Sequence, residues 1–149
     1  MKSRNVAALF IQKIKTALLP YNEAKSMSSN NASIVVQAQL DAYNAKDLEA
    51  LLRAYAPDAQ LFDLHGEQTA SGEEELRARF SARLAEPDLH ARLLTRTIMG
   101  DVLVDHEIVT RNFQEGIGTV EMLCIYEVQN GRIQKATFAV GGKHIGAPG

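Results

Sequence analysis

The order of apolar patterns along the chain predicts an α+β fold, with helices first and an antiparallel sheet after them. Apolar residues recur every three or four positions between residues 34 and 55, which is the spacing of helices that pack on a core. From residue 91 onward the chain changes to long strand-like runs separated by short glycine-bearing turns. In this order of elements a bent sheet wraps around the helices and leaves a pocket between the two layers.

Length and charge limit the functions to consider. The chain has 149 residues, 46% of them hydrophobic, which suits one domain with its own core. Residues 34–149 hold 11 Lys or Arg against 17 Asp or Glu, so this part lacks the basic face that a nucleic-acid partner requires. A single cysteine, Cys124, excludes an internal disulfide and fits a reducing compartment, so we expect a cytoplasmic protein.

Residues 1–33 are predicted to be a separate segment before a domain at 34–149. An amphipathic helix over residues 1–19 is expected to end at Pro20, and residues 26–33, SMSSNNAS, are typical of a polar linker. The apolar run is too short for a secretory signal or a membrane span. Three interpretations stay open: a helix docked on the domain or its partner, an acid-poor targeting peptide, or translated upstream sequence in a chain whose natural start is Met27.

The domain is predicted to begin with two short helices and a strand that ends in a carboxylate. Asp47 can cap the second helix, because its side chain can accept from the free backbone donors of the first turn. Pro57 and Asp58 are expected to end that helix, and AQLFD then leads to Asp63. Residues 64–72 are expected to form a loop at the mouth of the pocket.

A third helix is predicted after this loop. Ser71 and Glu74 have the spacing of a capping box, and Pro87 stops the helix. Its buried stripe is Leu76, Phe80 and Leu84, and its solvated face is Arg77, Arg79 and Arg83. The arginines alone imply no ligand.

Four strands follow, at about residues 91–99, 102–113, 119–129 and 132–140. Asn130 and Gly131 lie between the last two and indicate a hairpin, because both residues of such a turn need positive φ. The predicted sheet is therefore antiparallel and meandering.

The stretch IVVQAQLDAYNAKDLEALLRAYAPDAQLFD resembles the start of the NTF2-like superfamily, whose members include ketosteroid isomerases and SnoaL-like polyketide cyclases. The strings GDVLVDHEIVTRN and IYEVQNGRIQKATF add a second similarity to SnoaL-like proteins. The two matches cover most of residues 34–140. They imply the cone-shaped, cystatin-like fold and leave the reaction open, because this superfamily includes enzymes, binding modules and association domains.

The resemblance implies one catalytic position. In ketosteroid-isomerase-like members a carboxylate at the end of the first strand moves a proton between two carbons, and Asp63 falls there. Gln39 stands where those isomerases have a tyrosine, and Cys124 falls at about the position of their second donor, an aspartate. The chain departs from the pattern at these two positions, which leaves Asp63 as a candidate base. The alternative is a strand-end aspartate that only binds loop amides.

Histidines provide candidate partners for Asp63. Asp105, His106 and Glu107 cannot form one site, because neighbours on a strand point to opposite faces. His106 lies on the more apolar face, so we expect it to face the interior and to act as acid or second base, with a plain core histidine as the alternative. His65 is a further candidate, and so is His144 in the glycine-rich tail.

No metal-ligand spacing, P-loop or dinucleotide fingerprint occurs in the sequence, so we expect no metal and no cofactor. Aromatic and neighbouring residues are expected to line the pocket or to pack as plain core. These residues are Gln39, Tyr43, Tyr55, Phe62, Met122, Cys124 and Tyr126. Cys124 is expected to be a buried small hydrophobe and not a nucleophile.

Two functions fit these observations. In the first, the domain binds a small apolar or cyclic molecule and performs isomerase, cyclase or dehydratase chemistry through Asp63, assisted by His106 or His65. In the second, it is a non-catalytic ligand-binding or dimerisation module, which a cavity below about 300 Å³ near Asp63 would favour. Leu123 and Ile125 on the outer sheet face predict a homodimer. No nucleic-acid or membrane partner is expected.

Overall fold

The computed structural model describes residues 6–146, and the ends of the predicted N-terminal helix and C-terminal tail, residues 1–5 and 147–149, lie outside the described residues. In chain order the elements are α1 (Val6–Ala45), α2 (Leu48–Arg53), β1 (Tyr55–Asp63), β2 (Gln68–Ser71), α3 (Gly72–Leu84), β3 (His90–Met99), β4 (Val102–Phe113), β5 (Gly116–Gln129) and β6 (Arg132–Ile145).

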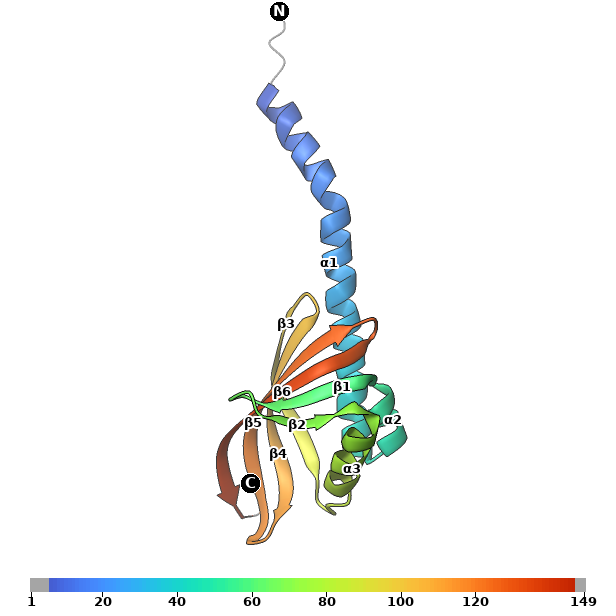
Figure 1. The fold of residues 1–149 in the computed structure, drawn as a ribbon. Coiled ribbons are helices and arrows are strands. Elements are labelled where there is room, and N and C mark those ends of the chain that lie inside the picture. The colour runs from blue at the N-terminus through green and yellow to red at the C-terminus, as the bar shows by residue number, and fades with distance from the viewer. Residues whose placement is uncertain (1–5, 147–149) are drawn as a thin grey trace, which may run out of the picture.

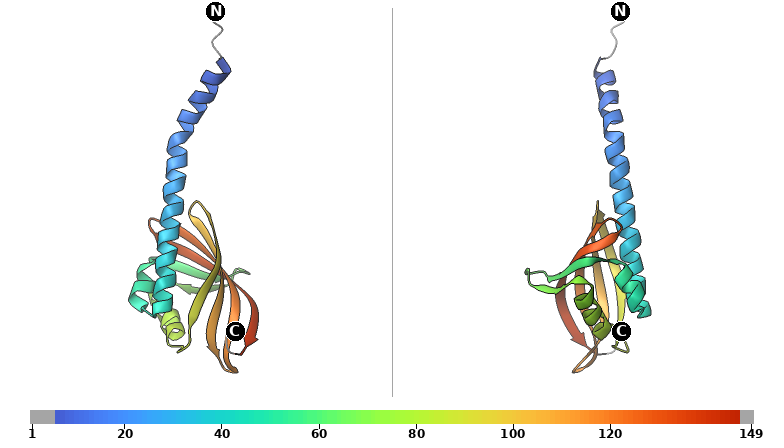
Figure 2. Two further views of the ribbon diagram at one scale, coloured as in Figure 1. Left: turned by 180° about the vertical axis from the view of Figure 1, so that it is seen from behind. Right: turned by 45° about the vertical axis from the view of Figure 1, so that its right-hand side comes forward.

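The described strands form one six-stranded sheet in the order β2-β1-β6-β5-β4-β3. All neighbours are antiparallel except β1 and β6, which run parallel. The sheet curves strongly, and the inner half of α1 lies against it together with α2 and α3 (Figures 1 and 2). The predicted α+β order and cone-shaped architecture are confirmed.

The sequence predicted a helix over residues 1–19, a linker at 26–33 and a second helix from residue 34. In the structure one helix, α1, takes the place of all three. It is continuous over 40 residues and contains Pro20. The helix bends in its outer half, which includes Pro20, as expected where a proline removes a backbone donor (Figure 1). The polar residues 26–33 stay helical because Ser and Asn each cost only a few tenths of a kcal/mol in a helix, and extending an anchored helix needs no new nucleus.

The outer half of α1 projects away from the domain (Figure 2). The large apolar side chains of Val6, Leu9, Phe10 and Ile14 are exposed there. Among the side chains of α1 that the structure describes, Ala32 and Val36 are the first buried ones. This segment is therefore not docked on its own domain.

The connection from α1 to β1 is shorter than predicted. Asp47 caps α2 as expected, with its carboxylate accepting from the backbone N–H of Ala50 at 3.0 Å. However, α2 ends at Arg53, and Pro57 lies within β1. Pro57 is tolerated there because the pairing of β1 with β6 is irregular between Tyr55 and Gln60, so the missing donor breaks no regular ladder.

The stretch predicted as a mouth loop contains β2, which pairs with β1. Ser71 is the N-cap of α3, as predicted, but its side chain makes no capping bond. The Glu75 carboxylate, and not that of Glu74, accepts from the backbone N–H of Ser71 at 2.7 Å. The predicted buried stripe of α3 is confirmed, and it consists of Leu76, Phe80 and Leu84.

The meander from β3 to β6 matches the prediction closely. Asn130 and Gly131 form the turn between β5 and β6, with φ of 52° and 75°. Asn44 ties α1 to the sheet, because its side chain both donates to and accepts from the backbone of Ala91, at 2.9 and 2.8 Å. These contacts hold the helix over the concave face of β3, β4 and β5.

Candidate functional site

Alternate residues of β4 face the helices and the outer side of the sheet. Leu103, Asp105, Glu107 and Val109 are buried on the inner face. His106 lies on the other face, where its Nε2 is 2.6 Å from Oε1 of Glu121. The expectation that His106 faces the interior is therefore wrong. The more apolar face of β4 is the outer one, because the two inner carboxylates are accommodated by partners that the residue pattern of one strand does not reveal.

Asp105 is accommodated by an arginine from β3. Arg96 donates from Nε and Nη2 to the two carboxylate oxygens of Asp105, at 2.7 and 2.8 Å, and from Nη1 to Oε1 of Gln37 at 2.9 Å. The hydrogen bonds to Asp105 raise the pKa of Arg96. Both oxygens of Asp105 are thus engaged, which makes this carboxylate a structural one.

Glu107 has no comparable partner. Its Oε2 accepts from the Cys124 thiol at 3.7 Å, while its Oε1 is buried and has no hydrogen-bond partner within residues 6–146. Burial raises the pKa of Glu107 to about 7, and the negative charge of Asp105 adds to this effect. A carboxyl group with this pKa can release or accept a proton near neutral pH.

Glu107 lies in an inner chamber of about 60 Å³ between α1 and the sheet. The polar residues that line this chamber are Gln39, Tyr43, Tyr55, Glu107, Cys124 and Tyr126. The Tyr126 hydroxyl donates to Oε1 of Gln39 at 3.4 Å. Burial raises the pKa of Tyr43, Tyr55 and Tyr126, so each phenol keeps its proton and remains a donor. Burial also raises the pKa of the Cys124 thiol, which disfavours a nucleophilic thiolate.

An outer chamber of about 250 Å³ adjoins the inner one. Tyr43, Phe80, Val109, Met122 and Phe138 line both chambers. Asp63, at the end of β1, lines the outer chamber and is half-buried. The two candidate carboxylates thus belong to neighbouring compartments, with Glu107 in the inner one and Asp63 in the outer one.

Besides His106, three residues considered as site candidates line neither chamber. His65 is exposed in the turn after β1, and His144 is exposed on β6. Phe62 lies under Lys135, whose Nζ is 4.8 Å from the ring centroid. The structure therefore brings none of the three predicted histidines next to Asp63 in this cavity.

Sequence reasoning did not identify Glu107 as a functional candidate. The pattern of β4 alone does not reveal it, because the face of Glu107 also carries Asp105 and is the less apolar of the two. The opposite residue on β5 is Met122, with Cys124 two positions along. A carboxylate among such neighbours is expected to be desolvated.

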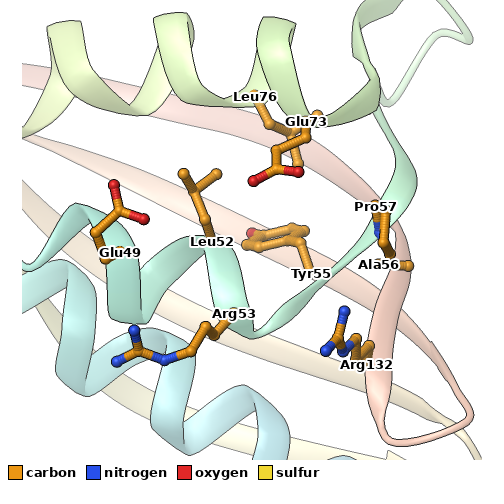
Figure 3. Close-up of a pocket in the computed structure, with 9 residues that line it drawn as sticks. All are labelled: Glu49, Leu52, Arg53, Tyr55, Ala56, Pro57, Glu73, Leu76 and Arg132. Carbon is orange, nitrogen blue, oxygen red and sulfur yellow. The ribbon is translucent and has the colours of Figure 1, made fainter.

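A separate hollow of about 120 Å³ lies between α2, α3 and the start of β1. Figure 3 shows the Tyr55 ring in its centre, with Leu52 beside it and charged side chains around it. These charges are of both signs, from Glu49, Glu73, Arg53 and Arg132. The volume is that of a few water molecules, and we assign no chemistry to this hollow.

No group of three or more His, Cys, Asp or Glu side chains that could hold a metal ion occurs within the described residues. Among the helices of the described part, none is both long and apolar enough to cross a bilayer.

The curved sheet, the helices on its concave face and the cavity between them define a domain of the NTF2-like class. The family model of the SnoaL-like domain matches residues 36–136, and the chain belongs to this family. No curated protein sequence is significantly similar to the chain.

Solved structures are similar to this fold. A cystatin-fold protein from Novosphingobium aromaticivorans has a TM-score of 0.67 at 22% identity, over 73% of this chain and 97% of that one. A SnoaL-like protein from Burkholderia thailandensis has a TM-score of 0.61 at 22% identity, over 76% and 96%. A protein of ketosteroid isomerase-like fold from Catenulispora acidiphila, solved with trimethylamine, has a TM-score of 0.61 at 16% identity, over 70% and 83%. At these identities the likeness concerns the fold alone.

Proposed function

We propose that this domain binds a small, largely apolar organic molecule across the two chambers and transfers a proton on it without a cofactor. The observation that carries the proposal is Glu107, a buried carboxyl group with one unpartnered oxygen among the described residues and a pKa of about 7. Carboxylates with raised pKa values in apolar cavities are suited to general acid and base catalysis near neutral pH.

The chemistry that these groups fit is proton transfer beside a carbonyl group. Oε1 of Glu107 takes a proton from a carbon next to the carbonyl, the electrons of the broken C–H bond move into an enolate, and the proton returns to the same or another carbon. The hydroxyl of Tyr43, a residue that lines both chambers, donates to the developing enolate oxygen. Asp63 remains the alternative base, for a substrate whose reacting carbon stays in the outer chamber.

The test is solvent exchange into carbon acids. A panel of cyclic ketones, lactones and quinones in deuterium oxide is incubated with wild type, Glu107→Gln and Asp63→Asn, and deuterium incorporation is followed by mass spectrometry. We expect at least one compound to exchange faster with wild type, and this rate to fall about a hundredfold in Glu107→Gln. Exchange that survives in Glu107→Gln and disappears in Asp63→Asn would assign the role of base to Asp63.

The alternative function is a ligand-binding module without chemistry. The size of the outer chamber favours it, because about 250 Å³ lies slightly below the range of about 300 to 1,000 Å³ of typical ligand pockets. Under this alternative, panel compounds raise the melting temperature of wild type and Glu107→Gln equally, and none of them exchanges.

We also propose that the outer face of the sheet pairs with a second copy of the chain. Leu123 is 42% exposed there, next to His106 across the β4–β5 pairing, and Ile125 follows on the same face. Apolar side chains of Val104 and Ile108 on β4 continue this face. Such a patch on a sheet face is typical of a protein interface.

A further inference from the structure

The outer chamber differs in charge from the rest of the domain. Four positive side chains line it, from Arg79, Arg83, Arg111 and Lys143, and Asp63 is the only carboxylate among the described residues of the same lining. Residues 34–149 hold 11 basic residues against 17 acidic ones. More than a third of the basic residues of an acidic domain thus gather around one opening, which produces a local positive potential.

These positive charges are only partly neutralised. One carboxylate, that of Glu86, accepts from both Arg83 and Arg111, at 2.7 Å and at 2.8 and 3.0 Å. Lys143 is paired with Glu115 at 3.0 Å. Arg79 makes no ion pair with any side chain of residues 6–146 and is exposed on α3. An incoming anion therefore meets the unpaired guanidinium of Arg79. It also meets the guanidinium groups of Arg83 and Arg111, which share the single negative charge of Glu86.

The lining of the two chambers changes from positively charged at the opening to apolar in the middle and acidic at the inner end. Beyond the basic opening lie Phe80, Val109, Met122 and Phe138, and beyond these lies Glu107. Glu107 and Arg111 are four residues apart on β4, which corresponds to about 13 Å of strand. A ligand that spans this distance has an anionic end, an apolar middle and a reactive or polar far end.

From this arrangement we infer that the ligand is a small organic carboxylate with an apolar ring or chain. Its carboxylate binds Arg79 and Arg83 at the opening, and its apolar part extends toward Glu107. Guanidinium groups bind carboxylates through paired hydrogen bonds, which explains why arginines and not only a lysine lie here. This inference deepens the function proposed above and rests on the same cavity, but it concerns binding and not the proton transfer.

The experiment compares acids with their neutral isosteres. Phenylacetate, 3-phenylpropanoate and 4-phenylbutanoate are titrated by calorimetry at low ionic strength, and each is matched by its primary amide. We expect the best acid to bind at least about tenfold more tightly than its amide, and this preference to shrink as salt is added. Amides that bind as tightly as the acids, or a whole series that fails to bind at millimolar concentration, would overturn the inference.

Variants of one helix locate the effect. Arg79→Gln and Arg83→Gln are each expected to weaken the acid by about three- to tenfold and to leave the amide unchanged. Arg77→Gln is the matched control, because Arg77 is on the same helix but pairs with Glu49 and Glu73 outside both chambers. Equal losses in Arg77→Gln and Arg79→Gln would contradict a carboxylate site at this opening.

The same titrations separate this inference from the proposed catalysis. Acids that bind selectively to wild type and to Glu107→Gln, together with no exchange in any carbonyl compound of the deuterium panel, refute the proton transfer and support the carboxylate site. Exchange on neutral ketones without any preference for acids supports the proton transfer and refutes the carboxylate site.

Discussion

The thiol of Cys124 on β5 faces the carboxyl group of Glu107 on β4, with Sγ 3.7 Å from Oε2. A thiol is a weak donor, so this contact compensates little of the cost of burying a carboxylate. On β4, two residues before Glu107, Asp105 accepts two hydrogen bonds from Arg96. The contrast explains why one buried carboxylate is structural and the other is available for proton transfer.

Glu107 is expected to make the stability of the domain depend on pH. Its pKa is about 7 in the folded protein and near 4.5 in the unfolded chain. Between these pH values Glu107 binds more protons in the folded protein than in the unfolded chain. The free energy of unfolding therefore falls as pH rises from about 4.5 to 7. Above about pH 7 this group has no further effect on it. The total loss is at most about 3 kcal/mol. Glu107→Gln removes the loss and is more stable than wild type at pH 8.

Urea unfolding at pH 5 and pH 8 measures this effect. The control is Glu127→Gln. Glu127 is a carboxylate on the outer side of β5 and pairs with Lys135 at 3.7 Å. It is expected to keep the pH dependence of wild type. If the unfolding free energy of Glu107→Gln falls between pH 5 and pH 8 as much as that of wild type, the carboxyl group of Glu107 is not desolvated as described.

Arg96 is expected to be essential for stability. Arg96→Met leaves Asp105 buried without its partner, which costs about 3 to 5 kcal/mol of unfolding free energy. The matched control is Arg92→Met on the same strand, which is exposed and is expected to change stability by at most about 0.5 kcal/mol. The double variant Arg96→Met with Asp105→Leu should recover much of the loss, because it removes the unpaired charge. Similar unfolding midpoints for Arg96→Met and Arg92→Met would contradict this account.

Tyr43 is expected to affect turnover more than binding. Tyr43→Phe removes the hydroxyl that is proposed to stabilise an enolate, so deuterium exchange of a responsive compound should slow by about a hundredfold. Its dissociation constant should change by less than about threefold, because the ring that lines both chambers is retained. A Tyr43→Phe variant that exchanges at the wild-type rate would exclude this hydroxyl as the donor.

The proposed dimer is tested at Leu123. At micromolar concentration we expect native mass spectrometry to show a dimer of wild type, and Leu123→Asp to raise the dissociation constant by at least about tenfold. Leu64→Asp is the control, because Leu64 is also exposed, at 53%, but lies in the turn after β1 and not on the sheet face. A monomeric wild type at this concentration would contradict the proposed dimer.

Several elements were predictable from the sequence because local rules determine them, whereas the helical residues 26–33 and the strand β2 were not predicted. The cap at Asp47, the turn at Asn130 and Gly131 and the buried stripe of α3 each follow from spacing within one element. The orientation of β4 was not predictable in this way. Asp105 faces inward because Arg96 from another strand neutralises it, and that pairing depends on the register between β3 and β4.

The candidate site was predictable only in part, for the same reason. Asp63 was placed at the end of β1 by resemblance, and the structure puts it in the wall of the outer chamber. Arg79 and Arg83 were predicted to be an ordinary solvated face, whereas the structure places them at the opening of the same chamber. Which helix face meets a cavity depends on how α3 docks on the sheet, and one helical pattern does not contain that information.

The alternation along β4 also bears on how the sheet finds its correct alignment during folding. A slip of one residue against β3 or β5 would turn Asp105 and Glu107 outward and bury His106. It would separate Arg96 from Asp105 and His106 from Glu121, and it would leave the histidine facing the apolar core without this partner. The charges that give the cavity its chemistry therefore also penalise misaligned hairpins, so substitutions that make β4 uniformly apolar are expected to yield misfolded or aggregating chains.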